Sequence, residues 1–212
     1  MRRLMVFCLL AASTATSACS LLQPKLRFTN RLVAPVQLSV GGGPRQTVAP
    51  GQTVAVPVSR GRTVVAEWEL VRPLSADNKP MGEELRGSVV LNSSGRNLRG
   101  AADARQGETA FFAPLVTNAA SEPLRVKVNA GLMGALDCGC AVRPGGTRVF
   151  VGYYRLYQNS TVRARGKAGE ATFRDIGPQV TNAEGSVGLR FEDKDLRPVT
   201  RPAAGTGART PA

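Results

Sequence analysis

TNRLVAPVQLSV, residues 29–40, recurs in altered form as TNAASEPLRVKV at residues 117–128. In both stretches an asparagine stands five residues before a proline, and three apolar residues then alternate with other residues. Alternation puts successive side chains on opposite faces of a strand, so the apolar side chains share one face. Each stretch therefore predicts a β-strand with one buried face, and the recurrence suggests that the chain uses one unit twice.

Three further blocks recur in the same order along the chain. The spacing between partners is 88 residues at first, then 94 and finally 98. The first increase means that the second unit gains six residues, which fall between positions 129 and 140. Four collinear blocks indicate an internal duplication. The later partners are VAPGQT 48–53 with VRPGGT 142–147, TVVA 63–66 with TVRA 161–164, and GSVVL 87–91 with GSVGL 185–189.

Turn residues separate the expected strands. Pro50-Gly51 and Pro144-Gly145 predict tight turns, because proline presets φ at the first central position and glycine accepts positive φ at the second. The β-branched runs 53–58 and 63–71 flank Ser59-Arg60-Gly61-Arg62, which predicts a hairpin. Short strands with a turn about every 8–12 residues are typical of all-β sandwiches and small barrels.

We therefore expect an all-β protein of two tandem small β-sandwich domains produced by internal duplication. Their general style resembles immunoglobulin-like or transthyretin-like export modules. The alternative is one β domain whose two halves share a core in pseudo-twofold fashion. The expected boundaries are a signal peptide 1–18, a lipid tether 19–26, repeat 1 at 27–100, a linker at 101–112, repeat 2 at 113–197 and a disordered tail 198–212.

The amino terminus has the layout of a secretory signal. Arg2 and Arg3 precede an apolar run at residues 4–12, and small residues follow up to Ala18. A membrane-spanning helix needs about 20 apolar residues, so this run is too short to be one. The start of the chain therefore predicts export.

Thr16-Ser17-Ala18-Cys19 resembles the lipobox of bacterial lipoproteins, although Thr16 stands where leucine is typical. The resemblance implies a diacylglyceryl group on the Cys19 thiol, cleavage before Cys19 and a membrane anchor, since two or more acyl chains hold a protein stably. In Gram-negative members of this class, Ser20 in place of Asp favours the outer membrane, facing the periplasm. The alternative is an ordinary secretory cut after Ala18.

The net charge of +13 restricts the classes of partner. A basic surface attracts acidic polymers, such as anionic lipid head groups, lipopolysaccharide or teichoic acid. Export argues against nucleic acid. Because the basic residues are spread along the sequence, an unidentified envelope protein remains as open as an anionic envelope polymer.

Cys138 and Cys140 flank a single glycine in the second unit. Outside the cytoplasm such a pair is expected to be oxidised, and a local structural disulfide is the default expectation. A bridge across one residue is tight and therefore reducible, so a redox role is the alternative. The chain has no histidine, and two cysteines do not complete a zinc site, so we expect no metal and no cofactor.

The usual catalytic groups are missing from the sequence. Without histidine there is no Ser-His-Asp triad and no His-paired cysteine nucleophile. Glu67 and Glu69 share a strand face beside Trp68, as paired glycosidase acids would, but exposed charges opposite a buried tryptophan explain them better. We expect a membrane-tethered, non-catalytic binding or scaffolding module of the cell envelope. The alternative is an envelope enzyme or redox factor using Cys138 and Cys140.

Two groups of residues are candidates for contact with a partner. Tyr153, Arg155 and Tyr157 would share one strand face by period 2, and aromatic residues with arginine can stack on sugars or meet a protein. The other interpretation is an ordinary core face with a tyrosine edge. The second group lies in the six-residue gain, which carries Leu132, Met133 and Leu136 beside the cysteines. That loop would either cover the open end of its own domain or bind a partner.

Overall fold

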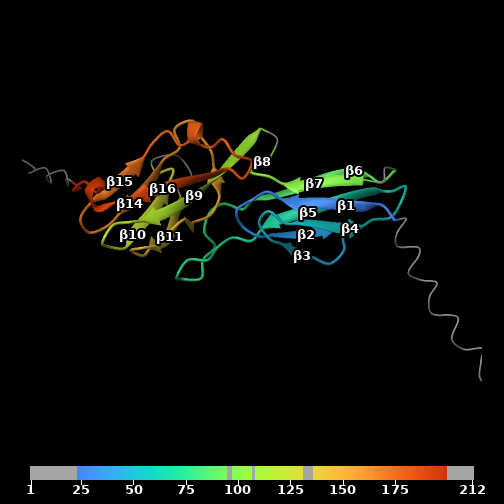
Figure 1. Ribbon diagram of the computed structural model, residues 1–212, viewed down its shortest axis with the longest axis horizontal. Coiled ribbons are helices and arrows are strands. Elements are labelled where there is room, and N and C mark those ends of the chain that lie inside the picture. The colour runs from blue at the N-terminus through green and yellow to red at the C-terminus, as the bar shows by residue number, and fades with distance from the viewer. Residues whose placement is uncertain (1–22, 95–96, 107, 131–135, 200–212) are drawn as a thin grey trace, which may run out of the picture. The chain divides into compact units, whose positions relative to one another are not determined.

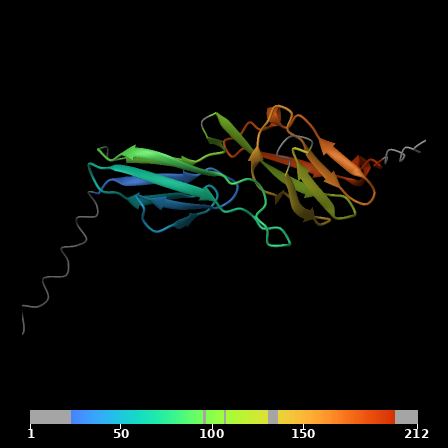
Figure 2. The same ribbon diagram turned by 180° about the vertical axis from the view of Figure 1, so that it is seen from behind.

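The computed structural model describes residues 23–94, 97–106, 108–130 and 136–199, without the side chains of Asn97 and of residues 136–139. The described chain is all-β, as expected: it contains no α-helix, and about half of it is strand (Figures 1 and 2). In this described part, the loops contain the single-turn 3₁₀ segments η2 (Gly177–Gln179) and η3 (Asp193–Asp195). The expected signal peptide, the lipidated Cys19 and nearly all of the expected tail lie outside the described residues.

The chain divides into two compact units. Of the described residues, those up to 71 and those within 85–103 form unit 1, and those within 72–84 and from 104 onward form unit 2. The segment 72–84 was expected in the first repeat but belongs to unit 2. The sequence pattern could not reveal this, because the segment carries turn residues and no apolar alternation that would assign it to a core.

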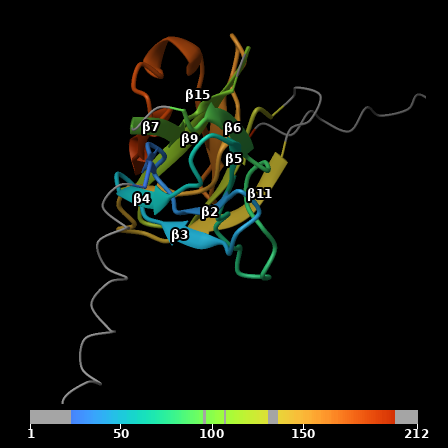
Figure 3. The same ribbon diagram turned by 90° about the vertical axis from the view of Figure 1, so that its right-hand side faces the viewer.

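Unit 1 contains two sheets. One has the order β4-β1-β7 and the other the order β3-β2-β5-β6 (Figures 1 and 3). The predicted alternation is confirmed in β2 and β5. Val36, Leu38 and Trp68 are buried, and their neighbours along each strand point outward. The strands are β1 (Lys25–Asn30), β2 (Val36–Val40), β3 (Gln46–Val48), β4 (Thr53–Pro57), β5 (Thr63–Leu70), β6 (Arg86–Asn92) and β7 (Asn97–Ala102).

The predicted hairpin around residues 59–62 does not form. β4 pairs with β1, whereas β5 pairs with β2 and β6, so this turn joins two sheets. Buried Ser93 holds the turn: its Oγ donates to the Ser59 carbonyl at 2.7 Å and accepts from the Arg62 N–H at 2.8 Å. Turn residues mark where the chain reverses, but they do not decide whether the flanking strands pair.

Unit 2 also contains two sheets. β9 is the hub of one, in which β12 and β13 pair with it antiparallel, β16 parallel and β8 antiparallel. The other has the order β11-β10-β14-β15. The strands are β8 (Arg105–Gln106), β9 (Thr109–Asn118), β10 (Leu124–Val128), β11 (Leu136–Val142), β12 (Val149–Phe150), β13 (Tyr154–Arg155), β14 (Val162–Arg165), β15 (Glu170–Phe173) and β16 (Ser186–Phe191).

One hydrophobic core joins the two sheets of unit 2. Phe112 and Val116 of β9 belong to the same buried cluster as Val126 of β10 and Val162 of β14. Met81, from the segment 72–84, is part of that cluster as well. The core therefore needs side chains from a part of the chain that precedes the rest of unit 2.

The expected linker at residues 101–112 is largely strand. It holds the end of β7, all of β8 and the start of β9, and Phe111 and Phe112 are buried. The boundary between the units falls between Asp103 and Ala104. Residues 103–108 contain a glycine and several charged residues, which is a composition typical of a linker. The apolar run that follows them forms β9, the central strand of a sheet.

The two units share a pattern of strand pairing and polar contacts. In each, the first long strand pairs with an antiparallel and a parallel strand, although β9 has two further antiparallel partners, β8 and β13. The next strand lies second in the order of a four-stranded sheet. Asn30 is buried and its Nδ2 donates to the carbonyls of Ala34 and Val48. Asn118 is buried likewise and donates to the carbonyls of Glu122 and Val142.

Candidate functional site

Basic side chains gather on the outer face of the sheet that contains β10 and β14. In β10 the apolar residues are buried, while Arg125 and Lys127 are exposed. In β14 Val162 and Ala164 are buried, and Arg163 and Arg165 point to the other side. Both strands are antiparallel neighbours, so their outward side chains form one basic face.

The register of the two strands places like charges opposite each other. Arg125 is the partner of Arg165, and Lys127 is the partner of Arg163. Directly opposed side chains of like charge destabilise a sheet. Two such pairs in succession therefore cost stability in the protein alone, and a bound anion would relieve their repulsion.

The face is hollowed into a cleft of about 410 Å³. Five basic side chains and one carboxylate line it, and that volume falls within the range of small-molecule sites. The lining residues are Pro123, Arg125, Lys127, Arg163, Arg165, Gly166, Lys167 and Glu170.

Two carboxylates organise the rim of the cleft. Glu170 Oε1 lies 3.2 Å from Arg163 Nε and forms an ion pair with it. Glu122 accepts the backbone N–H groups of Lys167 at 2.7 Å and Ala168 at 2.8 Å, which ties the turn after β14 to the start of β10. A Cβ at Gly166 would meet the Glu122 carboxylate, so a larger residue there would have to displace this side chain.

The cations of the cleft differ in how they are compensated. Glu170 is the register partner of Arg165 on β15, but its carboxylate pairs with Arg163. Within the described part of the chain, Arg125, Arg165 and Lys167 have no carboxylate partner for their charged groups. The uncompensated positive charge is thus concentrated at the end of the cleft near the turn after β14.

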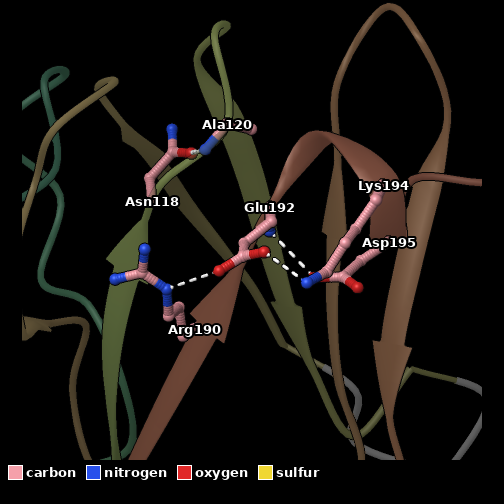
Figure 4. A network of polar contacts seen from close by, with 6 residues as sticks. All are labelled: Asn118, Ala120, Arg190, Glu192, Lys194 and Asp195. Atoms are coloured by element: carbon pink, nitrogen blue, oxygen red, sulfur yellow. Dashed lines mark hydrogen bonds and ion pairs between the residues drawn. The ribbon is translucent and has the colours of Figure 1, made fainter.

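A second polar cluster surrounds η3 and is satisfied internally (Figure 4). Glu192 pairs with Lys194 at 2.7 Å and Arg190 at 2.8 Å, and its backbone N–H donates to Asp195 at 2.9 Å. Hydrogen bonds from Lys194 and then Arg190 lower the pKa of Glu192 from 4.5 to about 2. Asp193 accepts from the backbone and hydroxyl of Ser121. These contacts hold η3, the segment that follows β16, in place against Ser121.

The tyrosine-rich segment is divided between core and surface. Tyr153 is fully buried, and its hydroxyl donates to the Glu184 carbonyl at 2.7 Å, which removes it from the predicted binding surface. Tyr157 is 40% exposed, and the exposed Arg155 pairs with Glu83 at 3.4 Å. Period 2 failed here because β13 is only two residues long and Gly152, with φ +112, disrupts the alternation.

Part of the six-residue gain lies outside the description, including Leu132 and Met133. Leu136 and Cys138 are in β11, but their side chains are not described, so their contact with a partner and the disulfide remain predictions. Cys140 is buried in the core of unit 2. Between Arg125 and Lys127 the β10–β11 register shifts, which places Cys138, Gly139 and Cys140 in a bulge opposite Val126.

The acidic pair of unit 1 is arranged as the sequence suggested. Trp68 is buried, Glu67 is exposed and Glu69 pairs with Arg45 at 3.4 Å. Neither carboxylate shares a described hydrogen bond with the other. Within the described residues, no group of three or more metal-ligating side chains is close enough to hold an ion.

Sequence reasoning missed the residues that line the basic cleft. The signal was present in Leu-Arg-Val-Lys-Val at 124–128 and Val-Arg-Ala-Arg at 162–165, where a cation occupies every second position. That spacing puts the charges of each strand on one face. The pairing of the two strands, which brings the four cations together, has no local signature.

Within the described chain, no helix is long and apolar enough to cross a bilayer. Comparison of the chain with models of protein families, with curated proteins and with solved structures found no match.

Proposed function

We propose that this chain is an exported protein, anchored to a membrane by lipid on Cys19, whose second unit binds an anionic component of the cell envelope without catalysing a reaction. The observation that carries the proposal is the basic cleft of unit 2. Five cations against one carboxylate in a cleft form an electrostatic trap for anions. The lipobox-like Thr16-Ser17-Ala18-Cys19 supports the anchor.

We further propose that both units are β-sandwiches and arose by duplication. The matching orders of the two four-stranded sheets, β3-β2-β5-β6 and β11-β10-β14-β15, and the matching contacts of Asn30 and Asn118 support this. The positions of unit 1 that correspond to the four cleft cations by sequence offset hold Gln37, Ser39, Val65 and Glu67. The basic face would therefore be a property that unit 2 acquired after the units diverged.

The proposal is tested by capture of envelope components on the purified full-length chain in mild detergent. Wild-type protein should retain an anionic component, and Arg125→Gln/Arg165→Gln should retain much less. Arg27→Gln/Arg99→Gln is the matched control, because these exposed arginines are also register partners, on β1 and β7 of unit 1. Equal retention by all three proteins would refute a function of the cleft.

The anchor has its own test. Mass spectrometry of the mature amino terminus should show a diacylglyceryl group on Cys19, and Cys19→Ala should leave the precursor uncut or release the protein from the membrane. An unmodified Cys19 at the mature terminus would remove the anchor from the proposal and leave the cleft untouched.

A further inference from the structure

We infer that the cleft of unit 2 binds phosphate monoester groups, at least two at a time and about 7 Å apart. This inference rests on the proposed function and specifies its ligand. The cations stand at two levels along β10: Arg125 with Arg165, then Lys127 with Arg163 two residues farther on. With a rise of about 3.4 Å per residue, the levels are about 7 Å apart.

Each level can hold one anionic group. Side chains directly opposite each other on paired strands start about 5 Å apart at Cβ, so two cations can converge on the oxygens of one group. Lys167 joins the first level from the turn after β14. Glu170 stands in register with Arg165, but its carboxylate pairs with Arg163 of the second level. Arg125, Arg165 and Lys167 therefore have no carboxylate partner within the described chain, and the first level is the stronger site.

The chemistry of the cations favours phosphate over carboxylate. Three of the five are arginines, whose planar guanidinium groups donate two parallel hydrogen bonds to phosphate oxygens. A phosphate monoester carries about −1.5 to −2 charge and three acceptor oxygens, whereas a carboxylate carries one charge and two oxygens. Two phosphates therefore balance the excess positive charge of the cleft, and two carboxylates do not.

The shape of the site favours a small ligand that enters the cleft, rather than a flat surface such as a membrane. The hollow of about 410 Å³ accommodates a sugar-sized unit with two phosphate substituents. Glu170 competes with the ligand at the second level, since it already holds Arg163 at 3.2 Å. Removing the Glu170 charge should therefore strengthen binding, an effect that a loss of folding cannot imitate.

The probe is inositol hexakisphosphate, a soluble ring with closely spaced phosphate monoesters, and benzenehexacarboxylate is its carboxylate counterpart. Calorimetric titration of the full-length chain in neutral detergent should show the phosphate probe binding at least about tenfold more tightly. Arg125→Gln/Arg165→Gln should weaken that binding by about tenfold or more, and Lys127→Gln/Arg163→Gln by less. Glu170→Gln should tighten it, and Arg27→Gln/Arg99→Gln should leave it unchanged.

The outcomes separate this inference from the proposed function. If the two probes bind equally well through Arg125 and Arg165, the cleft binds anions generally and the phosphate inference is wrong. If neither probe binds and no envelope anion is captured, both proposals fail. A vesicle arm distinguishes the source of the phosphate: binding to phosphatidic acid vesicles over phosphatidylcholine vesicles, without binding of the soluble probe, would indicate a membrane surface and overturn the cleft inference.

Discussion

Asn118 satisfies three backbone groups with one side chain. Its Nδ2 donates to the carbonyls of Glu122 at 2.9 Å and Val142 at 2.8 Å. Its Oδ1 accepts from the N–H of Ala120 at 2.9 Å, as Figure 4 shows. Fully buried, it joins the end of β9 to the strands that follow. Backbone hydrogen bonding therefore explains why an asparagine stands at this place in both copies of the recurring motif.

Asn118→Ala should lower the free energy of unfolding by about 3 kcal/mol or more, because two carbonyls and one N–H lose their partner inside the protein. Urea unfolding at neutral pH measures the change. Asn159→Ala is the control, since Asn159 is exposed in a turn and should change stability by less than about 0.5 kcal/mol. Equal stability of the two variants would show that water or relaxation replaces the lost bonds.

Glu192 should contribute to stability in a pH-dependent way. Its pKa is lowered to about 2 by Lys194 and Arg190, below the ordinary value of 4.5. A lowered folded-state pKa gives a contribution that is complete above about pH 4.5 and is lost as pH falls towards about 2. Wild type should therefore be more stable than Glu192→Gln at pH 7, and the difference should shrink through that window.

Thermal unfolding of both proteins between pH 7 and pH 2 tests this expectation. The difference should also fall in high salt, because Glu192 is at the surface and salt screens exposed ion pairs. A difference between the two proteins that stays constant from pH 7 to pH 2 would mean that the charge of Glu192 is not responsible for it.

At the scale of elements, the segment 72–84 is held to the rest of unit 2 by backbone and side-chain hydrogen bonds. The N–H of Glu83 donates to the Tyr153 carbonyl at 2.7 Å, and the N–H of Arg155 donates to the Glu83 carboxylate at 2.9 Å. Gly82 has φ +77, and a Cβ there would lie 2.8 Å from the backbone N and O of Tyr153. This close approach leaves room only for glycine.

Gly82→Ala should destabilise unit 2 by about 2–4 kcal/mol, because a positive φ and a collision with backbone atoms act together. Gly145→Ala is the matched control: its φ is +75, but nothing lies within 4 Å of an added Cβ, so only the backbone strain of about 1–2 kcal/mol remains. Chemical denaturation of both variants provides the comparison. If Gly82→Ala costs no more than Gly145→Ala, the docking of segment 72–84 is looser than described.

At the scale of the whole molecule, the division of the chain does not follow the linear sequence. Residues 72–84 lie between β5 and β6 of unit 1 but belong to unit 2. A fragment that starts at residue 104 therefore lacks Met81, which is 7% exposed and part of the core. Loss of a buried methionine side chain typically costs about 2–5 kcal/mol.

We therefore expect the fragment 104–199 to unfold at a lower temperature than unit 2 does in the intact chain. A synthetic peptide of residues 72–84 should raise that temperature when added in excess, by mass action. A peptide with Met81→Asp is the control and should have little effect. If the fragment is as stable as unit 2 in the intact chain and the peptide has no effect, the segment contributes nothing to the core.

The sequence by itself determined the all-β class, the face that each strong strand buries, and the turns at Gly51 and Gly145, whose φ values are +71 and +75. These properties are local, because period-2 alternation and the conformational freedom of glycine act within a few residues. Only the tertiary structure decided that β4 and β5 enter different sheets and that segment 72–84 joins unit 2. It also brought Arg125 and Lys127 beside Arg163 and Arg165. Such pairings join residues far apart in the chain, and no local pattern records which strand will become the neighbour of which.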